Sequence, residues 1–134
     1  WARPLLLFSN NPSAEIPETA MSEDLFEKII DREIPADIVF ENDELLAFRD
    51  INPQAPVHVL VIPKRKIRTL NDLDDSDAGL VGRMVLAAKE IAAGEGIAED
   101  GYRLNFNCNE RAGQSVWHIH LHLLGGRKMG WPPG

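Results

Sequence analysis

The sequence predicts an α+β domain built on an antiparallel sheet of about five strands, with one long and one short helix. Short runs of apolar and β-branched residues, separated by Gly, Pro, Asn and Asp, recur along the chain and are typical of strands. Two other segments carry apolar residues at helical spacing. The expected order is helix, two or three strands, long helix, two strands. Strand and helix do not alternate, as they would in a parallel α/β sheet.

Composition agrees with one small domain. The chain has 134 residues, of which 44% are hydrophobic, enough to form one core. No apolar run approaches 18 residues, so we expect no membrane association. Cys108 is the single cysteine, and with no recognisable secretory signal we expect a cytoplasmic protein. The formal charge of −7 argues against DNA or RNA as a partner, although one nucleotide in a small pocket remains compatible with it.

Residues 1–20 and 21–134 differ in character. The first segment contains three prolines and a Ser-Asn-Asn-Pro-Ser patch, with no sustained periodicity. We interpret it as a flexible N-terminal extension, or as a remnant of cloning or an upstream-translated leader ahead of Met21. Residues 21–134 are then the functional domain.

The first elements of that domain are a short helix and a hairpin. From Ser22 onward, apolar residues follow helical spacing with acids in the first turn, and Pro35 ends the helix. Residues 37–40 and 45–48 are predicted strands joined by a polar turn. The loop at 50–56 is rigid because its two prolines fix two φ angles.

The middle of the chain holds a central strand and the long helix. Residues 57–62 are apolar and β-branched, and they include His58. The basic residues that follow, 64–66, are either solvated charges or a site that steers phosphate. Apolar positions predict a helix over 76–93, and the acids at its start are more typical of helix capping than of a metal site.

Residues 101–109 alternate, with one face apolar and the other polar, so they predict a strand whose Asn109 or Asn107 faces a ligand. A turn leads into 114–126, the expected antiparallel neighbour, which contains three of the four histidines at two-residue spacing. On a strand, alternate side chains share a face at intervals of ~6.6 Å. The spacing therefore predicts one row of imidazoles, with Ile119, Leu121 and Leu123 packing on the opposite face.

Three interpretations of such a row are open. Two neighbouring histidines with His58 or Asp50 would make an open zinc site, but three histidines spanning ~13 Å on one strand cannot all reach one ion. Histidines that merely fill a core would each need partners for both ring nitrogens. The third interpretation is covalent catalysis, because neutral imidazole is a nucleophile near pH 7 and adjacent rings can handle protons. The central ring, His120, is the geometric favourite.

The run His118-Ile119-His120-Leu121-His122-Leu123-Leu124 resembles the signature of the histidine triad (HIT) superfamily. With Gln114-Ser115 before it and Trp131-Pro132-Pro133-Gly134 at the end, it is similar to the histidine triad nucleotide-binding branch, the purine nucleoside phosphoramidases. The resemblance implies a HIT-like fold whose sheet continues across a homodimer. It also implies a hydrolase that cleaves the P–N bond of purine nucleoside 5′-phosphoramidates through a nucleotidyl-histidine. It implies no required cofactor or metal, and copurified zinc would be adventitious.

The resemblance also assigns roles. His120 matches the nucleophile, His122 and Ser115 match positions that contact the leaving group, and His118 and His58 match residues that orient the nucleophile. The remaining matches concern the bound purine nucleotide. Asp50 would bind the ribose; Ile51, Phe40 and Phe48 would flank the base; Asn109, Gly113, Gln114, Ser115 and Val116 would surround the phosphate; and Trp131 would reach the partner's leaving-group pocket.

Two other functions remain alternatives. A dinucleoside polyphosphate hydrolase would use the same nucleophile, and a non-catalytic nucleotide-binding regulatory protein would use the same pocket without turnover.

Overall fold

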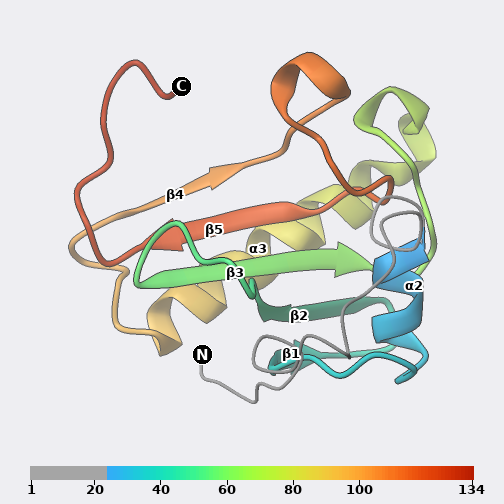
Figure 1. The fold of residues 1–134 in the computed structure, drawn as a ribbon, viewed down its shortest axis with the longest axis horizontal. Helices are drawn as coiled ribbons and strands as arrows, with labels where there is room; N and C mark the ends of the chain where they lie inside the picture. Colours follow the sequence, from blue (N-terminus) through green and yellow to red (C-terminus); the bar gives the residue numbers. More distant parts are fainter. Residues whose placement is uncertain (1–23) are drawn as a thin grey trace.

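Five antiparallel strands form a single sheet in the computed structural model, which describes residues 24–134 (Figure 1). The spatial order of the strands is β1-β2-β3-β5-β4. Their bounds are β1 Ile38–Glu41, β2 Leu45–Arg49, β3 Val57–Pro63, β4 Tyr102–Asn105 and β5 Leu121–Gly125. The predicted α+β class and the five-stranded antiparallel sheet are confirmed. The predicted extension at 1–20 lies outside the described residues.

Two helices accompany the sheet. The short helix α2, Leu25–Ile30, stands beside the ends of the strands in Figure 1, and the long helix α3, Ala78–Gly94, crosses behind the sheet. A single-turn 3-10 helix, η5 (Asp75–Asp77), precedes α3, and in it the side chains of Asp74 and Asp77 cap backbone N–H groups reciprocally. The acids before α3 therefore serve helix capping, as predicted. No helix among residues 24–134 is long and apolar enough to cross a membrane.

The two faces of the sheet pack against different helices. Leu45, Val59, Leu121 and Leu123 join residues of α3 in one buried apolar cluster, which we call the α3-side cluster. Leu46, Phe48, Leu60 and Ile62 alternate with them in sequence and join Phe26 and Ile29 of α2 in a second cluster, the α2-side cluster. The histidines lie on the α2 side, since His122 pairs in register with Leu60.

The prediction of one strand over residues 114–126 is wrong for the first half of that range. β5 begins only at Leu121, so His122 is on the strand while His118 and His120 lie in the irregular segment before it. The chain leaves the β3 ladder there because the Ile119 N–H donates to the carbonyl of Ile67, beyond the end of β3. The predicted alternation of side chains nevertheless persists, as Ile119 packs in the α3-side cluster together with Leu121 and Leu123.

Two other boundaries differ from the prediction. β4 ends at Asn105, so Asn109 is not on a strand. In β1 the register with β2 shifts between Ile38 and Phe40, which leaves Val39 as an extra residue. Such a bulge changes which face the following side chain occupies.

Candidate active site

The site is built from four segments around the start of β5. β3 supplies His58, the segment before β5 supplies His118 and His120, β5 supplies His122, and α2 supplies Phe26. The His120 and His122 rings lie 4.9 Å apart between centroids, and the His58 and His122 rings lie 5.2 Å apart. The structure therefore brings three imidazoles together: His120 and His122 from the predicted row, and His58 from β3.

His120 is held in one tautomer by the backbone. Its Nδ1 lies 2.8 Å from the carbonyl oxygen of His118. A carbonyl only accepts hydrogen bonds, so Nδ1 carries the proton and Nε2 of the neutral ring keeps its lone pair. The ring is 7% exposed, and burial lowers the pKa of His120 below its usual value, so the neutral form persists at neutral pH. His120 Nε2 is consequently a nitrogen nucleophile that needs no prior deprotonation.

The other two rings form a chain of hydrogen bonds with one consistent set of protons. The backbone N–H of Gln54 donates to His58 Nδ1 at 3.0 Å, which leaves the proton of neutral His58 on Nε2. His58 Nε2 lies 2.9 Å from His122 Nδ1, so it donates there. The proton of His122 is then on Nε2, which is buried and has no partner among the described residues. His122 thus presents a free N–H group.

The pKa values agree with neutral rings. Burial lowers the pKa of His58, against the opposing effect of the nearby Asp50 carboxylate, whose Oδ2 lies 3.5 Å from His58 Nε2. Burial and the neighbouring His120 and His58 lower the pKa of His122 to about 3. With both rings uncharged at neutral pH, the Gln54 N–H sets the direction of the N–H chain described above.

His118 differs from the other three histidines in its surroundings. Its ring is 1% exposed, and its Nε2–H donates to the carbonyl of Pro63 at 2.7 Å at the end of β3. Burial lowers the pKa of His118 as well. The ring is therefore embedded between α2 and β3, and what contacts His120 is the carbonyl of His118.

The loop that precedes the histidines is held by Gln114. This buried side chain accepts a hydrogen bond from the Asn109 N–H at 2.8 Å and donates to the carbonyls of Arg68 and Val116 at 2.7 and 3.1 Å. Both amide protons of Gln114 are thus committed to backbone carbonyls, and the expected place of Gln114 beside the phosphate stays a prediction.

The backbone N–H groups of the same loop differ in whether they already donate a hydrogen bond to a backbone carbonyl. Those of Gly113 and Gln114 donate to carbonyls within the loop, at Glu110 and Asn109. For the N–H groups of Ser115 and Val116, residues 24–134 offer no backbone acceptor. Ser115 is exposed, and Val116 packs against the α2-side cluster that borders the histidines.

The predicted base slot is only partly assembled. Phe48 is buried in the α2-side cluster, and Ile51 is 36% exposed in the loop that follows β2, next to Asp50. Phe40 instead packs against the α3-side cluster, on the opposite face of the sheet. The bulge at Val39 turns Phe40 to that face and away from Phe48, so its expected place beside the base finds no support in the packing and stays a prediction.

Two predicted residues stand apart from the rings. Trp131 is 84% exposed, in a tail tied to β4 by a hydrogen bond from Arg103 to the Gly130 carbonyl. Asn109 is exposed and has a φ of 70°, and its backbone, rather than its side chain, makes the loop contacts. Within residues 24–134 no hydrogen bond or ring contact joins either of them to the histidines.

Sequence reasoning missed two contributors. Phe26 of α2 stands edge-on to His120, with centroids 5.0 Å apart and an interplanar angle of 85°, and it also contacts His118 and Phe48. Gln54 acts through its backbone N–H. The helical spacing showed that Phe26 is buried, but no sequence signal tells which sheet face α2 covers or where a loop N–H points.

A metal ion is the competing occupant of this site. Asp50, His58 and His122 offer ligand atoms within 4.8 Å of one another, whereas His118 and His120 do not join them. Binding through His58 Nε2 would require that nitrogen to lose its proton while Nδ1 still accepts the Gln54 N–H. The ring would then be an imidazolate, so the donor set does not suit a metal without breaking that hydrogen bond.

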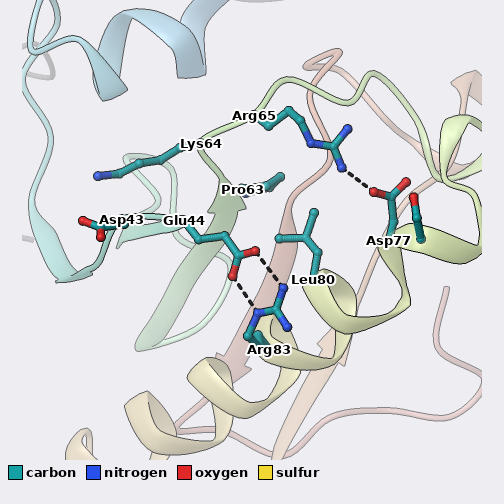
Figure 2. Close-up of a pocket in the computed structure, with 9 residues that line it drawn as sticks. Asp43, Glu44, Pro63, Lys64, Arg65, Asp77, Leu80 and Arg83 are labelled. Carbon is teal, nitrogen blue, oxygen red and sulfur yellow. Dashed lines mark hydrogen bonds and ion pairs between the residues drawn. The ribbon is translucent and has the colours of Figure 1, made fainter.

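A second pocket, of about 340 Å³, lies between the end of β3 and the start of α3 (Figure 2). No histidine lines it, although Pro63 does. Arg83 forms a bidentate pair with Glu44, at 2.7 and 2.8 Å, and Arg65 pairs with Asp77. The nearby Lys64 pairs with Glu41. These pairings leave little net positive field for phosphate and favour the interpretation of residues 64–66 as ordinary surface charge.

Known proteins match this chain over most of its length. The sequence model of the HIT domain matches residues 31–129. The purine nucleoside phosphoramidase of Escherichia coli is 56% identical over 108 residues, which cover 81% of this chain and 91% of that protein. An uncharacterised HIT-like protein of Synechococcus elongatus is 56% identical over 115 residues, covering 85% of this chain and all of that protein.

Solved structures agree with the sequence relatives. A HIT family hydrolase from Legionella pneumophila superposes with a TM-score of 0.81 at 58% identity, covering 82% of this chain and 98% of that one. A histidine triad protein from Clostridium difficile gives a TM-score of 0.77 at 40% identity, with 79% of this chain and 92% of that chain covered.

Proposed function

This chain belongs to the HIT domain family, and we propose that it is a hydrolase that cleaves the P–N bond of purine nucleoside 5′-phosphoramidates. The observation that carries the proposal is the tautomer of His120. A neutral imidazole with its Nδ1–H on a carbonyl presents Nε2 as a nucleophile, beside a second ring that presents an N–H. The 56% identity to a purine nucleoside phosphoramidase supports the substrate class.

The proposed reaction has two displacements at phosphorus. His120 Nε2 attacks the α-phosphorus, the P–N bond breaks, and its electron pair goes to the departing nitrogen. The nucleotidyl-imidazole is cationic and keeps its Nδ1–H on the His118 carbonyl, which stabilises that charge. Water then attacks the phosphorus, the N–P bond breaks, and the nucleoside monophosphate and His120 are released.

Protons balance across the two steps. The amine leaves neutral, so the first step takes up one proton, and the attack by water releases one. The His122 Nε2–H and the Ser115 hydroxyl are the groups proposed to contact the departing nitrogen. Because His122 is neutral, its N–H donates a hydrogen bond to the departing nitrogen, and the proton that the amine takes up comes from solvent.

Nucleotide contacts follow from the remaining groups. The Asp50 carboxylate, which also accepts the Asn52 N–H at 2.8 Å, is proposed to bind the ribose hydroxyls. The N–H groups of Ser115 and Val116 are proposed to bind the phosphate oxygens. Ile51 and Phe48 are proposed to flank the purine, with Asn109 and Gly113 shaping the phosphate side of the loop.

We also propose a homodimer. Among the strands that the structure describes, β4 is an edge strand that pairs with β5 alone, and α3 exposes Val85 and Leu86, at 39% and 58%. An unpaired strand edge and an exposed apolar helix face are each suited to a second copy of the chain, which would continue the sheet at β4. The exposed Trp131 would then reach the partner's site. Dissociation into monomers by Leu86→Asp, measured by analytical ultracentrifugation, would support this; an unchanged sedimentation coefficient or a monomeric wild type would contradict it.

The proposed activity is tested by hydrolysis of adenosine 5′-phosphoramidate by the intact protein and by His120→Ala, each with and without a chelator. We expect turnover that ignores the chelator and is lost in the variant. Activity that the chelator removes and zinc restores would contradict the mechanism. Cleavage of diadenosine polyphosphate alone would contradict the substrate class, and nucleotide binding without turnover would contradict an enzymatic role.

A further inference from the structure

The Gln54 residue is held on both sides of its Cα. Its N–H donates to His58 Nδ1, and its carbonyl accepts a hydrogen bond from Arg127 Nε at 3.0 Å. These two groups belong to successive peptide planes, so the two bonds together restrain both backbone dihedrals of Gln54. Arg127 therefore acts on the group that sets the tautomer of His58.

Arg127 lies just beyond the strand that carries His122. β5 ends at Gly125, and Gly126 has a φ of 91° and lies so close to Pro56 that an added Cβ would be 2.8 Å from its ring. Arg127 then bonds back to Gln54 and, through Nη1, to its neighbour's carbonyl at Lys128. The end of β5 and the 50–56 loop are thereby joined.

The loop has few other attachments of this kind. Within residues 24–134, the Gln54 side chain donates to the Asn52 carbonyl, the Asn52 N–H donates to Asp50, and the Asp50 N–H donates to the carbonyl of His58. These bonds all join residues within 50–58. The Arg127 bond instead connects Gln54 to a segment more than seventy positions away in sequence.

The orientation of the Gln54 N–H matters because the alternative proton arrangement reverses His122. If His58 carried its proton on Nδ1, His58 Nε2 would accept from His122 Nδ1–H, and His122 Nε2 would present a lone pair. A lone pair facing an anionic phosphoramidate repels it, whereas an N–H attracts it. Selecting between these two arrangements is the task of the Gln54 N–H.

We propose that Arg127 is a positioning residue for this reaction: by fixing the peptide unit of Gln54 it keeps the N–H of His122, rather than its lone pair, directed at the substrate. The proposal rests on the proposed function for its kinetic consequence. Its structural part concerns the tautomers of His58 and His122 alone and is measurable without substrate.

The test compares Arg127→Met with Arg103→Met in the full chain. Arg127 is exposed and Arg103 half-buried, and both donate to a backbone carbonyl, but Arg103 bonds to Gly130 in the same tail and, among the described residues, has no hydrogen bond to Gln54. Arg103→Met therefore loosens the tail after β5, but it leaves the attachment of the 50–56 loop intact. Each variant is assayed for kcat and KM from pH 4 to 8, and its histidine tautomers are read from ¹⁵N NMR shifts.

For Arg127→Met we expect kcat/KM to fall about 3- to 10-fold, the loss of one modest orienting hydrogen bond. Loosening the N–H donor also makes His58 Nδ1 easier to protonate, so the acidic limb of the rate profile moves to higher pH. The charged or titratable groups facing His58 are Asp50, His122 and His120. The His58 Nδ1 signal moves away from its unprotonated position. For Arg103→Met we expect none of these changes.

An unchanged His58 signal in Arg127→Met, or the same changes in Arg103→Met, would overturn the inference. If the wild type does not hydrolyse phosphoramidates at all, the proposed function fails, and the NMR comparison still decides whether Arg127 sets the tautomer.

Discussion

The two faces of the sheet are filled by opposite chemistry, although the same strands supply both. On the α3 side, buried Leu, Val, Ile, Ala and Met side chains form the larger apolar cluster, and no histidine lies among them. On the α2 side, a smaller apolar cluster borders four buried or half-buried imidazoles. Residues 118–123 alternate strictly between these environments. We infer that the α3 side supplies most of the stability of the fold. The α2 side supplies less, because it holds the reactive imidazoles.

The α2 side has a cost that the α3 side lacks. His118 Nδ1 and His122 Nε2 are buried without partners among the described residues, and an unsatisfied buried polar atom costs about 1–3 kcal/mol. His118 Nδ1 has no assigned use in the proposed reaction. His122 Nε2–H is the atom that a substrate would satisfy, so ligand binding should stabilise the protein.

The largest expected effect is that of His120→Ala on catalysis. We expect kcat to fall by at least about 10³-fold, because a covalent pathway cannot proceed without its nucleophile. The free energy of unfolding should fall by about 1–2 kcal/mol, from the lost hydrogen bond to the His118 carbonyl, as measured by urea denaturation. A loss of stability comparable to that of a core residue would remove the distinction between the two faces.

The matched substitution on the other face is its neighbour, Leu121→Ala. Leu121 is 2% exposed in the α3-side cluster, so we expect about 2–5 kcal/mol of destabilisation from lost burial and a residual cavity. For the fraction that remains folded, kcat should stay within about threefold of the wild type. A collapse of kcat in fully folded protein would show that the faces are coupled.

The pH dependence of stability isolates the histidine face. All four histidines of the chain have a lowered pKa in the fold, mainly through burial. An unfolded imidazole binds its proton near pH 6.5, so below that pH the unfolded state takes up more protons and stability falls. The limit is about 1.4 kcal/mol per pH unit for each histidine. Above about pH 6.5 this contribution vanishes.

Urea denaturation between pH 4.5 and 7.5 measures this slope. Carboxylates whose pKa values are lowered by ion pairs, such as Glu95 beside Arg49, add to the slope only below about pH 5, so the slope above that pH reports the histidines. His122→Asn should make the slope shallower, because the pKa of His122 falls furthest, to about 3. A flat profile for the wild type would mean that the imidazoles are not desolvated.

The smallest expected effect is that of Phe26→Leu, which changes a residue at the boundary between the α2-side cluster and the imidazoles. Phe26 supports the α2-side cluster and stands edge-on to His120. We expect about 1 kcal/mol of destabilisation and a three- to tenfold lower kcat from a less restrained nucleophile. An unchanged kcat with the same loss of stability would restrict Phe26 to packing.

Much of the packing on the α3 side could be predicted from the sequence. Alternation of Ile119, Leu121 and Leu123 predicted a buried face even though the strand begins only at Leu121, because alternation depends on extended backbone rather than on ladder hydrogen bonds. The acids before α3 were interpretable as caps for a similarly local reason.

The arrangement of the imidazoles on the α2 side depends on backbone groups whose positions the sequence does not reveal. The carbonyls of Pro63, Ile67 and His118 decide how the imidazoles are turned and why the chain leaves the ladder. The bulge at Val39 moved Phe40 to the other face, and the buried amide of Gln114 is used to close its own loop. These outcomes follow from tertiary geometry, which local spacing cannot specify.

The most direct test of covalent catalysis by His120 is to quench the reaction during turnover of adenosine 5′-phosphoramidate under alkaline denaturing conditions and map the protein by mass spectrometry. Covalent catalysis predicts an adenylylated peptide with the nucleotide on His120, and retention of configuration at phosphorus. An unmodified protein together with inversion of configuration would show that water attacks directly, and would contradict it.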